Sequence, residues 1–161
     1  MTLPDVVTTE RLRLPLITEI EAANMRAGRR DPLWHPDYPR PDDLDAIGFV
    51  RNGNPWGPRH IVRVFDGMVF GSIGFFGAPD DVQGAPEVEV GYGLVPEARG
   101  HGVAGEAVTG LLVHLDDLGV RVRARVEPTN TPGLRLLARS GFTELRGSDG
   151  EGNLIMARPL P

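Results

Sequence analysis

The chain of 161 residues contains no cysteine, which excludes disulfide bonds, thiolate metal ligands and thiol nucleophiles. Any group transfer must therefore use an oxygen or nitrogen nucleophile, or pass directly from donor to acceptor. Lysine is absent as well, and all 17 basic residues are arginine. The 4 histidines are not spaced as metal ligands are, so we expect no metal site.

Positive charge is in deficit, and long apolar runs are missing. Asp and Glu number 22 against 17 basic residues, which gives a formal net charge of −5. That balance argues against nucleic acid as the main partner. The stretch Met1–Leu14 has no apolar segment of signal-peptide length, and no later segment could span a bilayer. We therefore expect a cytoplasmic protein without a membrane partner.

The spacing of apolar residues predicts one α/β domain over residues 1–161, built on a mixed sheet. The order of elements is β, α, α, β, β, β, α, β, α, β, β, with no repeat and no linker. The expected strands are Arg11–Ile17, two within His60–Gly77 joined at Asp66-Gly67, Glu87–Val95, Val120–Glu127, Phe142–Leu145 and Asn153–Ala157. The expected helices are Glu19–Arg29, Asp42–Arg51, Val103–Leu118 and Thr131–Ser140, the last with Thr131 as its N-cap. The segments Arg30–Asp43 and Ala78–Pro86 are expected to be loops.

Three glycines in the stretch Arg99–Val108 spell G-x-G-x-x-G, the pattern of a dinucleotide-binding turn. An NAD-binding protein is disfavoured because Pro96–Arg99 separates the preceding strand from the first glycine, and too little chain follows Gly105 for a doubly wound sheet. The stretch would nevertheless aim the unpaired N–H groups of a helix N-terminus at an anion. A glycine-rich helix start that only packs tightly is the structural alternative.

Shifting the frame by one residue gives Arg99-x-x-Gly102-x-Ala104, and with this motif the chain resembles the GNAT superfamily of acyl-CoA-dependent N-acyltransferases. Three further stretches are similar to the branch of ribosomal-protein N-terminal acetyltransferases, and together the matches cover most of the chain. These stretches are Thr8–Thr18, Glu87–Val108 with Glu106, and Val126–Phe142 with Asn130.

The resemblance implies a GNAT-like fold, with a mixed central sheet of about six to seven strands and about four helices. Two parallel strands, here Glu87–Val95 and Val120–Glu127, would splay apart and hold the pantetheine arm of acetyl-CoA. The backbone of Leu94 and Val95 would bond the arm, and an N–H near Leu94 would polarise the thioester carbonyl as an oxyanion hole. The other implied cofactor-binding residues are Arg99, Gly100, His101, Gly102, Val103, Ala104, Gly105 and Asn130.

Transfer of an acetyl group to an amine needs a base, and two carboxylates on the central strand are candidates. Glu89 lies two residues before Gly91, where this branch often carries glutamate, and is our candidate base. Glu87 lies on the same face of the strand. For both, pairing with arginines of Val120–Glu127 is the structural alternative, which we prefer for Glu87.

The resemblance breaks at the proton donor for the leaving thiolate. The family's usual tyrosine position is Leu137 here, and the branch's serine position is Gly133. Tyr92, Thr131, Ser140 or a water molecule remain as candidates. A thiolate needs only modest protonation because the reference pKa of a thiol is about 8.5. This gap leaves open a non-catalytic acyl-CoA-binding or regulatory domain.

By resemblance, the acceptor enters from the side opposite the cofactor, next to Asp31–Asp45. This segment is rich in aspartate and contains a single arginine, which suits a cationic amine such as a peptide N-terminus, a polyamine or an aminoglycoside. An ordinary solvated loop is the alternative. The candidate acceptor contacts are Trp34, Tyr38, Trp56 and Glu87. A homodimer is what the family suggests for assembly.

Overall fold

Nine strands and four helices make up residues 2–161, the part of the chain that the computed structural model describes. The strands are β1 (Val6–Thr8), β2 (Leu12–Pro15), β3 (Arg59–Arg63), β4 (Val69–Phe75), β5 (Asp80–Val82), β6 (Ala85–Leu94), β7 (Arg121–Val126), β8 (Glu144–Ser148) and β9 (Leu154–Arg158). The helices are α1 (Glu19–Arg26), α2 (Pro41–Ala46), α3 (Val103–Leu118) and α4 (Thr131–Arg139), and short 3-10 turns cover Ile47–Phe49 and Pro96–Ala98.

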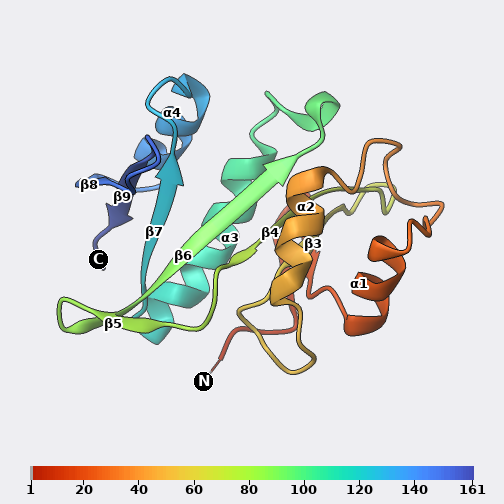
Figure 1. The fold of residues 1–161 in the computed structure, drawn as a ribbon, viewed down its shortest axis with the longest axis horizontal. Helices are drawn as coiled ribbons and strands as arrows, with labels where there is room; N and C mark the ends of the chain where they lie inside the picture. The colour runs from red at the N-terminus through yellow and green to blue at the C-terminus, as the bar shows by residue number, and fades with distance from the viewer. Residues whose placement is uncertain (1) are drawn as a thin grey trace.

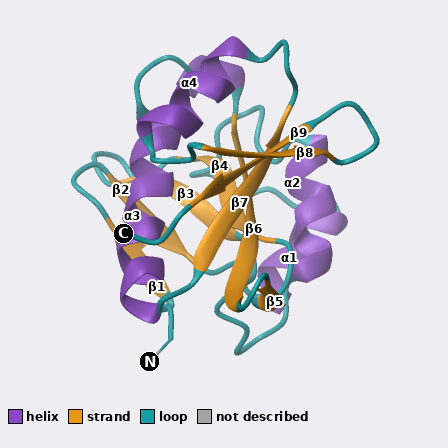
Figure 2. Cartoon of the chain, turned by 90° about the vertical axis from the view of Figure 1, so that its left-hand side faces the viewer, coloured by secondary structure: helices purple, strands orange, loops and turns teal. Residues whose placement is uncertain are grey.

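All nine strands belong to one mixed sheet, as the sequence predicts. The strand order is β1-β2-β3-β4-β6-β7-β9-β8, and β5 pairs with the beginning of β6. Figure 2 shows α1 and α2 on one face of this sheet and α3 and α4 on the other. A doubly wound parallel sheet is therefore ruled out, because only β6 and β7 pair in parallel.

The parallel pair β6–β7 separates along its length. Glu87, Val88 and Glu89 pair with residues 121 to 123, and no pairing follows although β6 continues to Leu94. Figure 1 shows the two arrows starting side by side near β5 and ending well apart. This confirms the splayed pair that the resemblance implies. On its β7 side, the C-terminal half of β6, from Val90 to Leu94, consequently presents backbone groups to a gap instead of a neighbouring strand.

Two elements differ in kind from the sequence-based expectation. The segment Ala78–Pro86, expected to be a loop, contains β5 and the start of β6, joined by a tight hairpin turn. Gln83 (φ 53°) and Gly84 (φ 82°) both take the left-handed conformation, as a two-residue type I′ turn requires. The short edge strand β1 was not expected at all, because three residues carry too little alternation to be recognised.

Helix boundaries show smaller corrections. α1 ends at Arg26, and the second expected helix divides into α2 and a 3-10 turn ending at Phe49. The N-cap of α4 is Asn130 and not Thr131, because the Asn130 side-chain oxygen accepts a hydrogen bond from the Gly133 N–H at 3.0 Å. The expected C-cap of α3 is confirmed: Gly119 has φ 70°.

The two faces of β6 and β7 differ in chemistry. Val88 and Val122 are buried in the apolar core, to which α3 contributes a stripe of buried side chains. The alternate positions carry Glu87 and Glu89 on β6 and the arginines of β7 on the opposite face. Within residues 2–161, no helix has the length and apolarity needed to cross a membrane.

Candidate active site

The glycine-rich loop before α3 has the backbone geometry of an anion cradle. Gly100 (φ 81°) and Gly102 (φ 76°) take the left-handed conformation, and Gly102 is the N-cap of α3 without a capping side chain. In the described part of the chain, no acceptor is bound to any N–H group from Gly100 to Gly105. A row of free donors at the positive end of a 16-residue helix attracts phosphate oxygens.

Arg11, just before β2, holds this loop in place from outside. Its Nε donates to Glu106 Oε1 of α3 at 2.6 Å, and its Nη1 donates to the carbonyl oxygen of His101 at 3.1 Å. Glu106 also accepts from the Thr9 hydroxyl and from the Arg11 N–H. Burial raises the pKa of Glu106, but these hydrogen bonds outweigh it and leave the pKa below its usual value. Glu106 thus links the first turn of α3 to Thr9 and Arg11, beside the loop.

The gap between β6 and β7 receives the N–H groups of alternate β6 residues. The Val95 N–H donates to Phe70 on the β4 side at 2.9 Å, and antiparallel alternation turns the Leu94 and Tyr92 N–H groups toward the gap. The Val95 carbonyl oxygen accepts from the Ala98 N–H, so both backbone groups of Val95 are bonded within the chain. Of the two expected residues, only Leu94 keeps a free N–H at the gap, while its carbonyl oxygen accepts from Arg99 Nε at 3.2 Å.

Both departures from the family pattern lie on α4. Asn130 uses its side-chain oxygen to cap α4. A side chain at Gly133 would place Cβ 2.6 Å from Asn130 Nδ2, so the serine found elsewhere in the branch would displace this cap. Leu137, at the family's tyrosine position, is fully buried in the core. Neither position supplies a proton donor.

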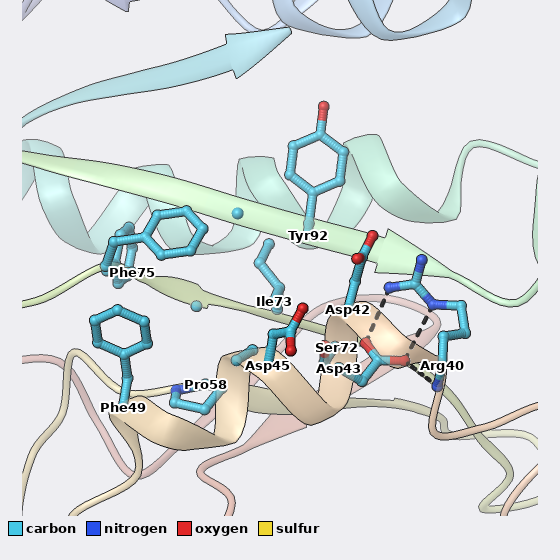
Figure 3. Close-up of a pocket in the computed structure, with 14 residues that line it drawn as sticks. Arg40, Asp42, Asp43, Asp45, Phe49, Pro58, Ser72, Ile73, Phe75 and Tyr92 are labelled. Atoms are coloured by element: carbon cyan, nitrogen blue, oxygen red, sulfur yellow. Dashed lines mark hydrogen bonds and ion pairs between the residues drawn. The ribbon is translucent and has the colours of Figure 1, made fainter. Parts of the chain in front are cut away.

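A cavity of about 310 Å³ lies between α2 and the strands β4 and β6 (Figure 3). Arg40 stands at one end and Phe49 and Phe75 at the other, with aspartates of α2 between them. The full lining is Arg40, Asp42, Asp43, Asp45, Ala46, Phe49, Pro58, Ser72, Ile73, Gly74, Phe75, Phe76, Gly91 and Tyr92. This volume is at the small end of the range for sites that take small molecules.

A hydrogen-bonded cluster closes one end of the cavity. Arg40 donates to both oxygens of the buried Asp43, at 3.0 and 2.9 Å, and the Ser72 hydroxyl donates to the same carboxylate. The Arg40 guanidinium lies over Gly93 of β6, where a Cβ atom would collide with it. The glycine therefore lets an arginine of the α2 side approach the central strand at the level of the gap.

Glu87 and Glu89 both sit in ion-pair networks, with different degrees of burial. The buried Glu87 lies 2.7 Å from Arg146, 3.0 Å from Arg123 and 3.4 Å from Arg121. Burial raises its pKa, but the hydrogen bonds from Arg146 and Arg123 outweigh this and lower it overall. This geometry matches the structural interpretation preferred for Glu87, which does not line the cavity.

Glu89 lies 2.7 Å from Arg125 and 3.4 Å from Arg123, and 12% of its side chain is exposed. It shares its strand face with Gly91, which lines the cavity. The two ion pairs compete with a role as base, because a proton taken up by the carboxylate would break them.

The aromatic residues expected to line the acceptor mouth are not in the cavity wall. Tyr38 is fully buried, and its hydroxyl bonds to His60 Nδ1 at 2.8 Å. Trp34 packs edge-on against Tyr38 with ring centroids 5.7 Å apart, and Trp56 packs against Phe75 at 5.6 Å. Tyr38 belongs to the apolar core, and Trp34 and Trp56 pack against it, where burial of their large surfaces stabilises the fold.

Among the proton-donor candidates, Tyr92 alone reaches the gap. Figure 3 shows its ring rising from β6 away from α2. Within residues 2–161 its hydroxyl has no hydrogen-bond partner, and burial raises its pKa, so it stays protonated at neutral pH. Thr131 is exposed at the start of α4, and Ser140 is its C-cap residue.

The segment Asp31–Asp45, expected beside the acceptor, does line the cavity, through Arg40, Asp42, Asp43 and Asp45. Sequence reasoning missed the sheet residues Ser72 and Phe76, which belong to no motif and meet this segment only through the packing of α2 on the sheet. The one available signal was the pair of glycines in the strand segment Gly91-Tyr92-Gly93, which marks a close approach of other groups to the backbone. Among residues 2–161, no group of three or more His, Asp or Glu side chains could hold a metal ion.

Comparison with known proteins agrees with this geometry. The family model described as an acetyltransferase (GNAT) domain matches residues 11–143, whereas no curated protein matches the chain. Among solved structures, an acetyltransferase from Agrobacterium tumefaciens is similar, with 21% identity, a TM-score of 0.66 and coverage of 99% of this chain and 96% of that one.

Two further solved structures share the fold. A ribosomal-protein-S5-alanine acetyltransferase from Vibrio fischeri is 18% identical, with a TM-score of 0.66 and 96% coverage of both chains. A GNAT-family acetyltransferase from Bacillus anthracis is 19% identical, with a TM-score of 0.59 and coverage of 94% of this chain and 95% of that one. These likenesses show the fold, and the family model spans most of the sequence: the chain belongs to the GNAT family of acetyltransferases.

Proposed function

We propose that the chain transfers an acetyl group from acetyl-CoA to a primary amine, directly and within a ternary complex. The observation that carries this proposal is the row of free N–H groups from Gly100 to Gly105 beside the gap between β6 and β7. A pyrophosphate on those donors would place an extended arm along the unpaired edge of β6. The cavity under α2 is lined by Gly91 and Tyr92 in the unpaired stretch of β6 and would hold the amine.

The residues present fit acetyl-CoA, which when bound supplies the acetyl thioester. Gly100, Gly102 and the first turn of α3 bind the pyrophosphate through their backbone. The Leu94 N–H donates toward the thioester carbonyl oxygen and stabilises negative charge that develops there. The glycine pattern then matches the NAD-binding motif in sequence only, because the sheet around it is not the doubly wound sheet that binds NAD.

Two side chains of the protein accept and donate the protons of the reaction. The amine nitrogen forms a bond to the acetyl carbon, the carbon–sulfur bond breaks, and the nitrogen gives up one proton. Glu89 takes this proton, directly or through a water molecule, from the cavity side of β6. The Tyr92 hydroxyl donates toward the departing sulfur from within the gap.

The test is amine-dependent release of the CoA thiol, followed with a thiol-reactive chromophore. The chain contributes no thiol of its own, so every signal reports CoA. We expect acetyl-CoA to bind in the micromolar range and a panel of primary amines to include acetylated members. Failure to bind acetyl-CoA would refute the proposal.

A non-catalytic acyl-CoA-binding domain is the second candidate function. Two observations favour it: Glu89 is engaged by arginines, and the family's tyrosine position is the buried Leu137. This candidate requires tight binding of acetyl-CoA without turnover for any amine in a broad panel. Detectable acetyl transfer at a rate above the uncatalysed reaction eliminates it.

A further inference from the structure

The wall chemistry of the cavity under α2 distinguishes between classes of acceptor amine. The exposed rings of Phe49 and Phe76 form an apolar wall of the cavity, where they meet edge-to-face with centroids 5.6 Å apart. The backbone of Gly74 and Gly91 continues this wall along the sheet. An apolar segment of a ligand would be desolvated against these side chains.

The opposite wall carries fixed negative charge. Asp42 and Asp45 point from α2 toward β6 (Figure 3). Neither carboxylate has an ion-pair partner or a hydrogen bond among residues 2–161. The third aspartate, Asp43, is already neutralised by Arg40. The charge left over in the cavity is therefore negative, and it faces the apolar wall across a space of about 310 Å³.

Helix stability does not account for this arrangement. Asp42 lies in the first turn of α2, where the helix dipole favours a carboxylate. Asp45 lies in the last turn, where the dipole disfavours one, and it is three residues from Asp42 on the same helix, where like charges repel. A ligand cation between the two carboxylates would offset both the repulsion between them and the unfavourable position of Asp45 in the helix dipole.

The Arg40 end of the cavity carries no net charge. The guanidinium lies over Gly93, beside the edge of β6 along which the reacting groups meet, and it is paired with Asp43. The unpaired negative charge is therefore confined to Asp42 and Asp45 on α2, away from the edge of β6 at Gly93. The cavity consequently suits a ligand with a positive charge near α2 and its reacting amine near β6.

Resting on the proposed function, we infer that the acceptor is a compact diamine: a reacting primary amine joined by an apolar spacer to a second cationic group. Its reacting amine lies at β6, its spacer lies against the rings of Phe49 and Phe76, and its second cation lies between Asp42 and Asp45. A zwitterionic acceptor would bring its carboxylate against these two aspartates and bind poorly.

The test compares three amines of one chain length at saturating acetyl-CoA: 1,5-diaminopentane, pentylamine and 5-aminopentanoate. We expect kcat/KM to fall in that order, with the diamine about tenfold above pentylamine, equivalent to about 1.4 kcal/mol. The double variant D42N/D45N should reduce the diamine-to-pentylamine ratio several-fold. D37N is the matched control, because Asp37 is exposed on the same segment outside the cavity and should leave the ratio unchanged.

Several outcomes would overturn the inference while leaving the proposed function intact. These are equal kcat/KM for diamine and pentylamine, a preference for 5-aminopentanoate, a higher kcat/KM for a peptide N-terminus, or an unchanged ratio in D42N/D45N. Absence of acetyl-CoA binding would instead refute the proposed function itself. Binding without transfer to any of the three amines would overturn the diamine inference and favour the non-catalytic alternative.

Discussion

The contact between Gly93 and Arg40 is the most sensitive point of the candidate site at the scale of single residues. A Cβ on Gly93 would collide with the guanidinium, and moving the arginine would leave the buried Asp43 without its cation. We expect Gly93→Ala to lower the free energy of unfolding by as much as about 3 kcal/mol, because an uncompensated buried charge is costly. Urea denaturation measures the change.

Gly91→Ala is the matched control for that substitution. Its Cβ would meet only the tip of Phe76, at 2.6 Å, and this partly exposed ring can rotate away. The loss of stability should therefore be distinctly smaller than for Gly93→Ala. Equal losses in the two variants would show that the Arg40–Asp43 contact is not what makes Gly93 necessary.

Glu89 offers a direct test of the proposed base. Glu89→Gln keeps the shape of the side chain and removes its ability to accept a proton, so we expect kcat to fall on the order of 10²-fold. The dissociation constant for acetyl-CoA should stay within about threefold of the parent value, because the carboxylate lies on the cavity side of β6. Steady-state kinetics and titration calorimetry give the two quantities. An unchanged kcat would leave Glu89 with only its ion pairs to Arg125 and Arg123.

At the scale of elements, substitutions where the loop meets α3 distinguish between the G-x-G-x-x-G and the Arg99-x-x-Gly102-x-Ala104 interpretations of the glycine pattern. Gly102 has φ 76°, a conformation that costs a non-glycine residue about 1–2 kcal/mol. We expect Gly102→Ala to weaken acetyl-CoA binding roughly tenfold by displacing the N–H donors. A fluorescence or calorimetric titration measures this directly.

Gly105→Ala is the control within the same element. Gly105 lies in the first turn of α3 with ordinary helical geometry, and its Cβ would approach Leu136 only to 4.0 Å. Alanine keeps the backbone N–H that Gly105 offers to the pyrophosphate, so this variant should keep its affinity for acetyl-CoA and gain about 0.5–1 kcal/mol of stability from the helix. A loss of affinity as large as that of Gly102→Ala would instead support the G-x-G-x-x-G interpretation, in which all three glycines are required.

Elements with a strong periodic pattern were predictable from the sequence, and elements fixed by long-range contacts were not. Three predictions were confirmed because each depends on a local signal. They are the helix α3 from its apolar stripe, the strand β7 from its alternating residues, and the end of α3 from its C-cap glycine, Gly119. The strand β5 was missed because its turn depends on Gln83 adopting a positive φ. The cavity under α2 was missed in detail because Arg40 and Gly93 are far apart in sequence.

At the scale of the whole molecule, depressed carboxylate pKa values predict sensitivity to acid. A hydrogen bond from His60 is the main cause that lowers the pKa of Glu21 from 4.5 to about 2. A folded-state pKa below the unfolded value means that the stabilisation is complete above about pH 4.5 and disappears as the pH falls through about 2. Glu87 and Glu106 have shifts of the same sign.

We therefore expect the melting temperature to fall between pH 5 and pH 2, and Glu21→Gln to make this fall shallower. Thermal unfolding followed by circular dichroism across this range provides the comparison. Because the Glu21 carboxylate becomes protonated as the pH falls through about 2, the variant should approach the parent in stability at the acid end. An identical pH dependence in parent and variant would contradict the role assigned to the Glu21–His60 contact.

The central claim concerns the whole site: the splayed strands and the free N–H groups before α3 together receive acetyl-CoA. The most direct test is the melting temperature with acetyl-CoA, CoA, NAD or no ligand. A ligand at 100 times its dissociation constant adds about 2.7 kcal/mol of stability, which raises the melting temperature of a domain this size by several degrees. We predict such a rise with acetyl-CoA and CoA and none with NAD. No rise with acetyl-CoA, or an equal rise with NAD, would contradict the claim.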